Sequence, residues 1–468
     1  MARKISKAEI GQILEQGCDE RVHLIEDTNR NKYHLNPVEY ETLLQRGSCT
    51  ANLLTPRSHG VAKAFLGKYD ELNYESLLEK QSKRLIDLVG SENNEPFDIY
   101  FGPSGSDLVY YPLMFQLMLN PNKKLINIVS CPEELGSGSG YASETRFYAN
   151  FNQFGENIVK GDFVDPKHVS EVHYLDARDA EGNILDRSKA IENIIADNKD
   201  AAVVGSLVFG SKSGIKDDLD IIDPNDGTMW VVDLCQFRVD PKLIHDLLEK
   251  DVMIMLTGSK FFQAPPFCAA MLVPRKWSER LKEVDASIIA PYGKLFSAYD
   301  VPWFMQNMRE YLPENENKSL RLRWEIALDE MEAYSYWSTA QTDDIITRWA
   351  TGVMARLEDS EHFKLMPDQL KTNMSIISFQ VWVGGRALNN AELKDLFKAI
   401  ATSTHEGFKD GINKVFFGQP VQYGDKSFIR LAIGAYSVRS FLEVDAIDLH
   451  NDYRVIEIIE DYAKKMFG

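Results

Sequence analysis

A lysine and an aspartate stand where two neighbouring strands of a predicted sheet end. Asp233 closes the segment MWVVD, and Lys260 follows the segment VMIMLT, 27 positions further on (260 − 233). Because open α/β sheets bind their ligands at the carboxyl ends of the strands, both side chains are expected at that edge. The residues FFQAPPF, which follow the lysine, would partly desolvate its amine and make it nucleophilic toward an aldehyde. A solvated surface lysine and a turn-capping aspartate are the alternatives, and the pairing of the two favours function.

A Gly/Ser turn between a strand and a helix offers a place for a phosphate group. The segment DIYFGPSGSDLVYYPL places Gly105 and Ser106 where the free backbone amides of a helix begin, and such amides bind anions. Asp107 is acidic beside this supposed anion site, so we expect it to cap the helix with its side chain turned away. The hydroxyls of Thr257 and Ser259, just before the lysine, are the natural second half of a phosphate site. A tight turn with a helix cap and no ligand is the alternative.

Short apolar runs predict the sheet that positions these residues. Continuous runs of this length suit strands buried on both faces of a mostly parallel sheet, which helices cover. We therefore predict an α/β fold, with a three-layer, mostly parallel sheet in a large domain at 86–314. The predicted strands are 97–102, 124–130, 201–209, 229–233, 252–257 and 269–274, and the covering helices include 107–119 and 240–250.

The rest of the chain predicts a smaller domain and an N-terminal arm, because 468 residues exceed what one core usually organises. Residues 1–85 are expected to form an arm of helices and turns, with a loop at 50–65. A long linking helix is expected within 315–340, covering about 315–337. A small C-terminal α+β domain follows at 341–468, with strands at 374–383 and 427–434 and helices at 343–358, 390–402 and 441–466.

This arrangement resembles the fold type I family of enzymes that depend on pyridoxal 5′-phosphate (PLP), the aspartate aminotransferase superfamily. The Asp-x-x-Gln of DLCQ is most similar to its class V branch of aminotransferases and cysteine desulfurases, and the resemblance covers roughly residues 95–440. It implies PLP held as a Schiff base on Lys260, which then acts as general acid and base. It also implies that Asp233 keeps the pyridine nitrogen protonated and that Gln236 bonds the phenolic oxygen.

The resemblance further implies where phosphate and substrate bind. The turn at Gly105 and Ser106, with Thr257 and Ser259, would hold the cofactor phosphate. Ser213 and Gly214 fall where the family has a cofactor-facing turn. Arg430 in SFIRLAIGA lies where the family commonly pairs an arginine with a substrate carboxylate, which implies amino-acid substrates. In a chain this acidic, Arg430 could instead neutralise neighbouring carboxylates.

One feature departs from the class V pattern. That branch places a histidine over the cofactor ring after the strand at 124–130, whereas this chain has CPEELGSGSGY. Glu134, Leu135 or Tyr141 could cover the ring, and the sequence does not choose among them. The family builds its active site across a subunit interface, which implies a homodimer, with residues 297–303 (SAYDVPW) contributed by the partner.

Composition excludes several classes of function. The formal charge of −18 would repel phosphate backbones and anionic lipid, so nucleic acid and membrane are not expected partners. No run approaches the length of a membrane span, and the N-terminus has no secretory signal. The five scattered cysteines (Cys18, Cys49, Cys131, Cys235, Cys268) contain no CxxC pair, which argues against a zinc site and against disulfides. We expect a cytoplasmic protein without a metal.

An aminotransferase is the predicted activity. The alternatives are a PLP-dependent lyase, which eliminates or decarboxylates, and a catalytically silent binding protein with the same fold. A persulfide mechanism is disfavoured because no cysteine follows Cys268, and a decarboxylase because the stacking histidine is missing. A cofactor-free hydrolase is weaker still, since no G-x-S-x-G motif is present. Arg57, His59, Cys235 and Cys268 are interpreted as ordinary structural residues.

Overall fold

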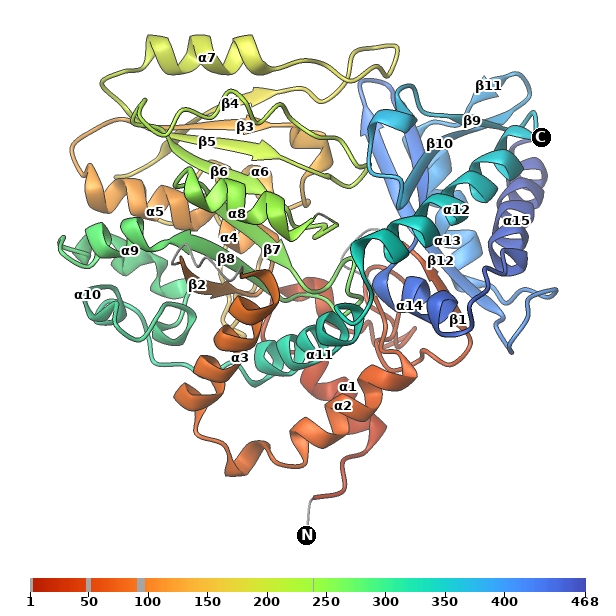
Figure 1. The fold of residues 1–468 in the computed structure, drawn as a ribbon, viewed down its shortest axis with the longest axis horizontal. Helices are drawn as coiled ribbons and strands as arrows, with labels where there is room; N and C mark the ends of the chain where they lie inside the picture. The colour runs from red at the N-terminus through yellow and green to blue at the C-terminus, as the bar shows by residue number, and fades with distance from the viewer. Residues whose placement is uncertain (1–2, 48–51, 91–96, 239) are drawn as a thin grey trace.

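Two mixed β-sheets organise the chain (Figure 1). The computed structural model describes residues 3–47, 52–90, 97–238 and 240–468, so Cys49 lies outside the described residues. The larger sheet has seven strands: β2 (Phe97–Gly102), β3 (Leu125–Ser130), β4 (Ser170–Leu175), β5 (Ala202–Val208), β6 (Met229–Asp233), β7 (Met253–Thr257) and β8 (Ala269–Pro274). All six predicted strands are confirmed, and the edge strand β4 was not predicted.

The order of the larger sheet is β2-β8-β7-β6-β5-β3-β4. Strands β3 to β7 pair in parallel, and β8 is antiparallel to both of its neighbours, β2 and β7. Because β2 and β7 both oppose β8, the carboxyl ends of β2, β3, β5, β6 and β7 lie at one edge. The turns that carry Gly105, Asp233 and Lys260 therefore meet at this edge.

Helices cover both faces of the larger sheet and give the predicted three layers (Figure 1). Successive residues of a strand point to opposite faces, so Val232 of β6 enters one core and Val231 enters the other. One layer contains α3 (Tyr74–Val89), α7 (Ser188–Asp197), α8 (Pro241–Glu249) and α11 (Lys318–Tyr334). The other contains α4 (Gly105–Leu108), α5 (Tyr110–Leu119), α6 (Ser139–Ser143) and α9 (Arg275–Leu281).

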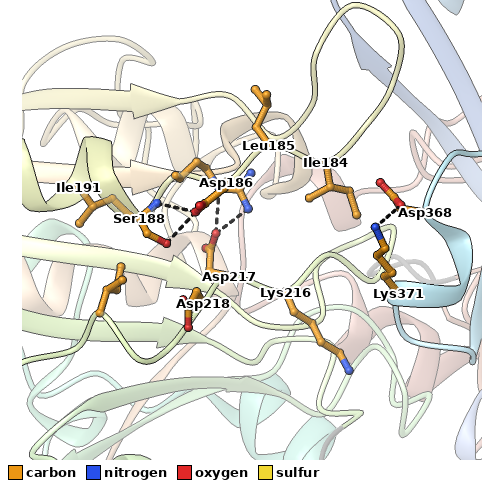
Figure 2. A pocket seen from close by; sticks show the side chains of 12 residues that line it. Ile184, Leu185, Asp186, Ser188, Ile191, Lys216, Asp217, Asp218, Asp368 and Lys371 are labelled. Carbon is orange, nitrogen blue, oxygen red and sulfur yellow. Dashed lines mark hydrogen bonds and ion pairs between the residues drawn. The ribbon is translucent and has the colours of Figure 1, made fainter.

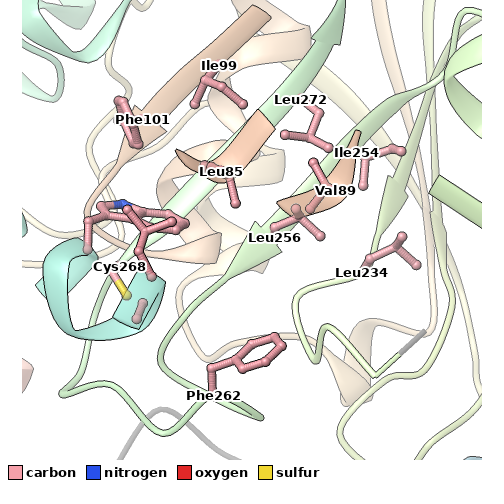
Figure 3. Close-up of a cluster of buried hydrophobic side chains, with 14 of the residues drawn as sticks. Leu85, Val89, Ile99, Phe101, Leu234, Ile254, Leu256, Phe262, Cys268 and Leu272 are labelled. Atoms are coloured by element: carbon pink, nitrogen blue, oxygen red, sulfur yellow. The ribbon is translucent and has the colours of Figure 1, made fainter. Parts of the chain in front are cut away.

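The first of these cores supports the sheet edge directly. Figure 3 shows Leu85 and Val89 of α3 gathered with Leu256 of β7 and with Leu234, which follows Asp233. Leu256 and Leu234 are completely buried. Burying a leucine side chain contributes about 2 kcal/mol, so the residues next to the site are held by the core.

The smaller sheet lies toward the C-terminus and contains six described strands. They are β1 (Leu43–Arg46), β9 (Phe363–Leu365), β10 (Ile376–Val383), β11 (Arg386–Ala387), β12 (Lys414–Tyr423) and β13 (Lys426–Ala432). The helices packed with it are α12 (Thr339–Glu358), α13 (Asn390–Thr402), α14 (Ala435–Glu443) and α15 (His450–Phe467). The strands predicted at 374–383 and 427–434 are confirmed. The single final helix at 441–466 is wrong, because the chain turns at Asp445, with φ 50°, between α14 and α15.

The N-terminal segment is more than the predicted arm of helices and turns. Its strand β1 pairs in parallel with β12, with Leu43 opposite Lys414, and so belongs to the smaller sheet. The loop expected at 50–65 is also wrong, since α2 (Pro56–Leu66) begins there and Thr55 caps it. Helix α1 (Lys7–Leu14) precedes both. The described short helices are α10 (Gln306–Arg309) and the 3-10 turns Glu20–Val22, Tyr69–Glu71, Pro132–Glu134, Ser287–Lys294, Ala298–Asp300 and Gln369–Lys371.

The linking helix is confirmed as α11, whose first turn is capped by the side chain of Asn317. The domain limits at residues 85, 314 and 340 stay a prediction. Within the described residues, no helix combines the length and apolar character needed to cross a bilayer. No group of three or more His, Cys, Asp or Glu in the described ranges is arranged to hold a metal ion.

Candidate active site

The phosphate turn, the aspartate strand and the lysine strand converge at the carboxyl edge of the larger sheet. A methyl group placed on Gly105 would lie 3.0 Å from Sγ of Cys235 and 3.8 Å from Cγ2 of Thr257. The hydroxyl of Thr257 donates a hydrogen bond to the carbonyl of Cys235 at 2.7 Å. The turn after β2 therefore contacts the ends of β6 and β7, and a glycine is needed for this close approach.

Asp233 and Lys260 both act on the same neighbour. Oδ1 of Asp233 accepts a hydrogen bond from the backbone N–H of Cys235 at 2.7 Å. Burial raises the pKa of the Cys235 thiol, the Asp233 carboxylate raises it further, and the Lys260 ammonium opposes the rise. Each charge is therefore close to this thiol. Both side chains are partly exposed, and neither forms an ion pair with a described residue.

The backbone of the lysine turn is fixed from two sides. The side-chain amide of Asn52 donates to the carbonyls of Ser259 and Lys260, at 2.7 and 3.0 Å. On the other side, a methyl group on Gly258 would come 2.4 Å from Cβ of Ala327 in α11. The hydroxyl of Ser259 is buried and has no hydrogen-bond partner in the described part of the chain. Buried polar atoms are normally partnered, so this hydroxyl suits a ligand oxygen.

Asp107 caps the short helix α4, as the sequence predicted. Its Oδ2 accepts hydrogen bonds from the N–H of Ser104 at 2.8 Å and from the Ser104 hydroxyl at 2.7 Å. The hydroxyl of Tyr148 donates to its Oδ1 at 2.8 Å. Burial raises the pKa of Asp107 to about 6. The Ser106 hydroxyl lies 3.2 Å from that of Ser139.

An ion pair from the N-terminal segment lies beside this turn, and the sequence did not indicate it. Nη2 of Arg21 is 2.6 Å from Oδ2 of Asp19 and 3.4 Å from the Ser104 hydroxyl. The guanidinium also stacks on Phe267, 4.3 Å from the ring centre. Burial raises the pKa of Asp19, but the charge and hydrogen bonds of Arg21 outweigh it and bring the pKa to about 2. No local motif marks a contact between segments so far apart in the chain.

The candidates for covering a cofactor ring lie in different surroundings. Glu134 is engaged elsewhere, because its carboxylate accepts from the hydroxyls of Ser211 and Ser213 at 2.8 and 2.7 Å. The side chain of Tyr141 is 39% exposed. Leu135 lines the same small cavity as Asp233, whose free volume is about 20 Å³. Of the three, only Leu135 therefore borders the cavity at Asp233.

The remaining predicted residues lie at the boundary between the two sheets. The carboxamide oxygen of buried Gln236 accepts from Nε of Arg238 at 3.3 Å. Arg430 projects from β13 and donates to the backbone carbonyls of Lys212 and Gln419, at 3.0 and 2.6 Å. Arg430 thus reaches from the smaller sheet to the loop that follows β5, although it was expected to face a substrate carboxylate.

The segment expected from a partner subunit divides into two parts. Asp300 is buried within its own chain, where its carboxylate accepts from the N–H of Ser297 at 2.8 Å. Trp303 is 61% exposed. Only the end of this segment is therefore available to a second subunit.

A larger cavity, of about 310 Å³, lies outside this site (Figure 2). Four of its charged side chains are paired, Arg187 with Asp217 and Lys371 with Asp368, each at 2.7 Å.

The fold has known counterparts among solved structures, although no family model and no curated protein matches the chain. The crystal structure of a phosphoserine aminotransferase from Cytophaga hutchinsonii matches 92% of this chain and 99% of its own, with a TM-score of 0.53 and 14% identity. The chain therefore shares the fold of this aminotransferase. The seven-stranded sheet and the second, smaller sheet agree with it, so the predicted fold is confirmed.

Two further solved structures match with similar TM-scores. Tryptophan decarboxylase from Catharanthus roseus, solved in complex with L-tryptophan, gives a TM-score of 0.54 at 13% identity, covering 89% of this chain and 82% of that one. TDC from Oryza sativa, solved with PLP and tryptamine, gives 0.53 at 12% identity, covering 94% and 85%. At such identities the likeness establishes the fold, and it does not distinguish the class V branch from others.

Proposed function

We propose that this chain binds PLP through Lys260 and acts as an aminotransferase on an amino acid. The observation that carries the proposal is the placement of Asp233 at the end of β6 and of Lys260 just after β7, two adjacent parallel strands. The Gly105 turn and the partnerless Ser259 hydroxyl lie at the same edge. The lysine amine would hold the cofactor's aldehyde group covalently. The carboxylate of Asp233 would accept a hydrogen bond from the protonated ring nitrogen. Gln236 would bond the phenolic oxygen, and Gly105, Ser106, Thr257 and Ser259 the phosphate.

Each residue has a stated task in the proposed reaction. Bound PLP supplies a ring that withdraws electrons from the substrate carbon. The carboxylate of Asp233 favours the cationic form of the ring nitrogen, because an opposite charge stabilises that form. The amine of Lys260, once released, carries a proton to or from the substrate. Arg430 would bind the substrate carboxylate with its planar guanidinium.

The assembly and location proposed for the protein follow from the same assignment. We propose a homodimer, in which the exposed Trp303 lies near the subunit contact. We also propose a cytoplasmic protein acting on a small amino acid or amine.

One observation favours a second candidate, a PLP-fold protein that binds the cofactor without turnover. Leu135 lines the small cavity that contains Asp233. A leucine side chain has no flat ring to stack on the cofactor, whereas the class V pattern has a histidine there. This departure supports a protein that keeps the fold and the cofactor but has lost turnover.

Covalent trapping tests the proposal. Purified protein is incubated with PLP, reduced with borohydride, and digested for peptide mapping. We expect a pyridoxyl group on Lys260, lost in Lys260→Ala and retained in a Lys282→Ala control, which changes an exposed lysine. An amino-acid-driven spectral change with release of a 2-oxo acid supports the aminotransferase, whereas amine or elimination products would identify a lyase. An adduct without any spectral change supports the binding protein, and no adduct overturns PLP binding.

A further inference from the structure

Arg238 lies at the boundary between the two sheets, beside the candidate active site. It follows Gln236 by two residues and donates to the Gln236 carboxamide oxygen at 3.3 Å. Its Nη1 donates to the Ser375 hydroxyl at 2.7 Å and to the Ile433 carbonyl at 2.6 Å. Its guanidinium stacks 4.9 Å from the ring centre of Phe261, the residue directly after the candidate lysine. The arginine therefore joins the end of β6 to the smaller sheet, next to the lysine turn.

The positive charge of Arg238 is not balanced by a carboxylate. No described acidic side chain lies within 4.0 Å of it, and its Nη2 is buried without a hydrogen-bond partner in the described ranges. Burial lowers the pKa of Arg238 to about 9, and the nearby cation of Arg430 acts in the same direction. A largely buried cation without a counter-charge is costly, so an anion that enters here gains a strong interaction.

Some buried arginines of this chain are neutralised by a carboxylate. Arg46 pairs with Asp452 at 2.6 Å, and Arg439 pairs with Glu330 at 3.1 Å. Arg321 and Arg323 on α11 also lack a carboxylate: Arg321 stacks on Phe101, 4.2 Å from the ring centre, and Arg323 donates to the carbonyls of Leu14 and Gln16. Arg238 thus combines an unbalanced charge with a place beside the candidate catalytic lysine.

We propose that Arg238 binds an acidic group on the substrate side chain, so that this site selects amino acids with a second carboxylate or a phosphate. The inference rests on the proposed function and names its substrate class. Arg430 comes from β13 and would take the main carboxylate, whereas Arg238 comes from the loop after β6. A ligand with two acidic groups would engage both guanidinium groups with charge-assisted hydrogen bonds. The two N–H groups of Nη2 suit one carboxylate or phosphate oxygen pair.

Calorimetric titration with simple acids tests the pocket without relying on turnover. Succinate, with two carboxylates, is compared with butanoate, with one. We expect the wild type to bind succinate about 10- to 100-fold more tightly, the effect of one hydrogen bond to a charged group. Arg238→Gln should lose that preference and leave the affinity for butanoate within about twofold. Arg348→Gln, which changes an exposed arginine, is the control and should keep the preference.

Spectral titrations of the PLP-loaded protein then distinguish the two acidic groups. L-aspartate and L-glutamate test the second carboxylate and O-phospho-L-serine the phosphate, against L-alanine. If Arg238→Gln does not fold, Arg238→Lys decides, because it keeps the charge but loses the planar fork and should weaken succinate binding by about tenfold.

Equal affinity of the wild type for succinate and butanoate would overturn the inference, as would equal loss of both acids in the variant. A Lys260 adduct without any preference for dianions rejects this inference alone. A preference for dianions without a Lys260 adduct rejects the proposed function and keeps Arg238 as an anion site.

Discussion

The side-chain amide of Asn52 donates a hydrogen bond to the backbone carbonyl of Lys260 at 3.0 Å. The same amide donates to the carbonyl of Ser259 at 2.7 Å, and Asn52 is 1% exposed. A residue of the N-terminal segment thus holds the turn that presents the lysine. The orientation of the amine therefore depends on a residue of the N-terminal segment, which is not part of the larger sheet.

Asn52→Ala should destabilise the protein and disturb the lysine turn. Two buried carbonyls would lose their donor, at a cost of about 1–3 kcal/mol for each group. Urea unfolding measures the loss of stability, and the yield of pyridoxyl adduct on Lys260 measures the disturbance. Asn225→Ala, on an exposed loop, serves as the control and should change neither. An unchanged midpoint in Asn52→Ala would show that water replaces the amide.

Asp233→Asn should separate charge from structure. The asparagine oxygen still accepts the N–H of Cys235, so the free energy of unfolding should change by less than about 1 kcal/mol. Turnover should fall by at least about 100-fold, because the group facing the cationic ring has lost its charge. Asp226→Asn is the matched control, because exposed Asp226 also accepts a hydrogen bond from the N–H two residues on. Retained turnover in Asp233→Asn contradicts the role of this carboxylate.

Two glycine substitutions should change the free energy of unfolding in opposite directions. In Gly258→Ala the new methyl group would lie 2.4 Å from Cβ of Ala327, which forces α11 to shift and costs about 1–3 kcal/mol. In Gly60→Ala no atom lies within 4 Å of the new methyl group, and the residue lies within helix α2. That change should stabilise by about 0.5–1 kcal/mol, because alanine has the higher helix propensity. Denaturant unfolding of both variants makes the comparison, and a shared sign would refute the packing at Gly258.

Asp107 should make stability fall as the pH rises. Its pKa is about 6 when folded, against an ordinary value of 3.8, so the folded state binds more protons between these values. The contribution is fully present below pH 3.8 and is lost as the pH rises through 6, an effect of about 3 kcal/mol. Between pH 4.5 and 7.5, urea unfolding should show a pH dependence that is weaker by about 2 kcal/mol in Asp107→Asn, because the unfolded carboxyl is already mostly ionised at pH 4.5. Asp300 has a similar pKa of about 6 and titrates in both proteins, so its contribution cancels when the two are compared. Parallel curves would contradict the burial of an ionised Asp107.

Arg21→Gln should be among the most damaging single substitutions. It leaves the carboxylate of Asp19 buried without its partner, at a cost of about 3–5 kcal/mol. The double variant Asp19→Asn, Arg21→Gln should recover part of that loss, because no charge then remains buried. Lys83→Gln breaks an exposed pair with Asp87 and should cost less than about 1 kcal/mol. Thermal unfolding of the four proteins provides the measurement, and a mild effect of Arg21→Gln alone would show that water reaches Asp19.

The sequence predicted the strands that are buried on both faces and missed those that are not. MWVVD and VMIMLT are continuous apolar runs. In contrast, SEVHYL of the edge strand β4 mixes polar residues with apolar ones. β12 reads KVFFGQPVQY, and its glycine and proline argue against a strand. The structure accommodates them with a register shift between Gly418 and Val421.

The site divides in the same way. Lys260 and Asp233 could be named because each directly follows a predicted strand, and strand ends converge in such sheets. Asn52, Arg21 and Arg238 could not, because their contacts join segments that only the folded chain brings together. Arg238 had one usable signal, its place two residues after Gln236, in the segment that contains the predicted cofactor residues.

The parallel pairing of β1 with β12 has a consequence for synthesis of the protein. Leu43 leaves the ribosome ~370 residues before Lys414, its neighbour in the sheet. At typical elongation rates this interval lasts roughly 20 to 70 s. During that time the early strand has no mate, and its open backbone is a template for pairing with another nascent chain. Completion of the smaller sheet is therefore a late event in synthesis, and premature pairing between neighbouring nascent chains is the risk that it carries.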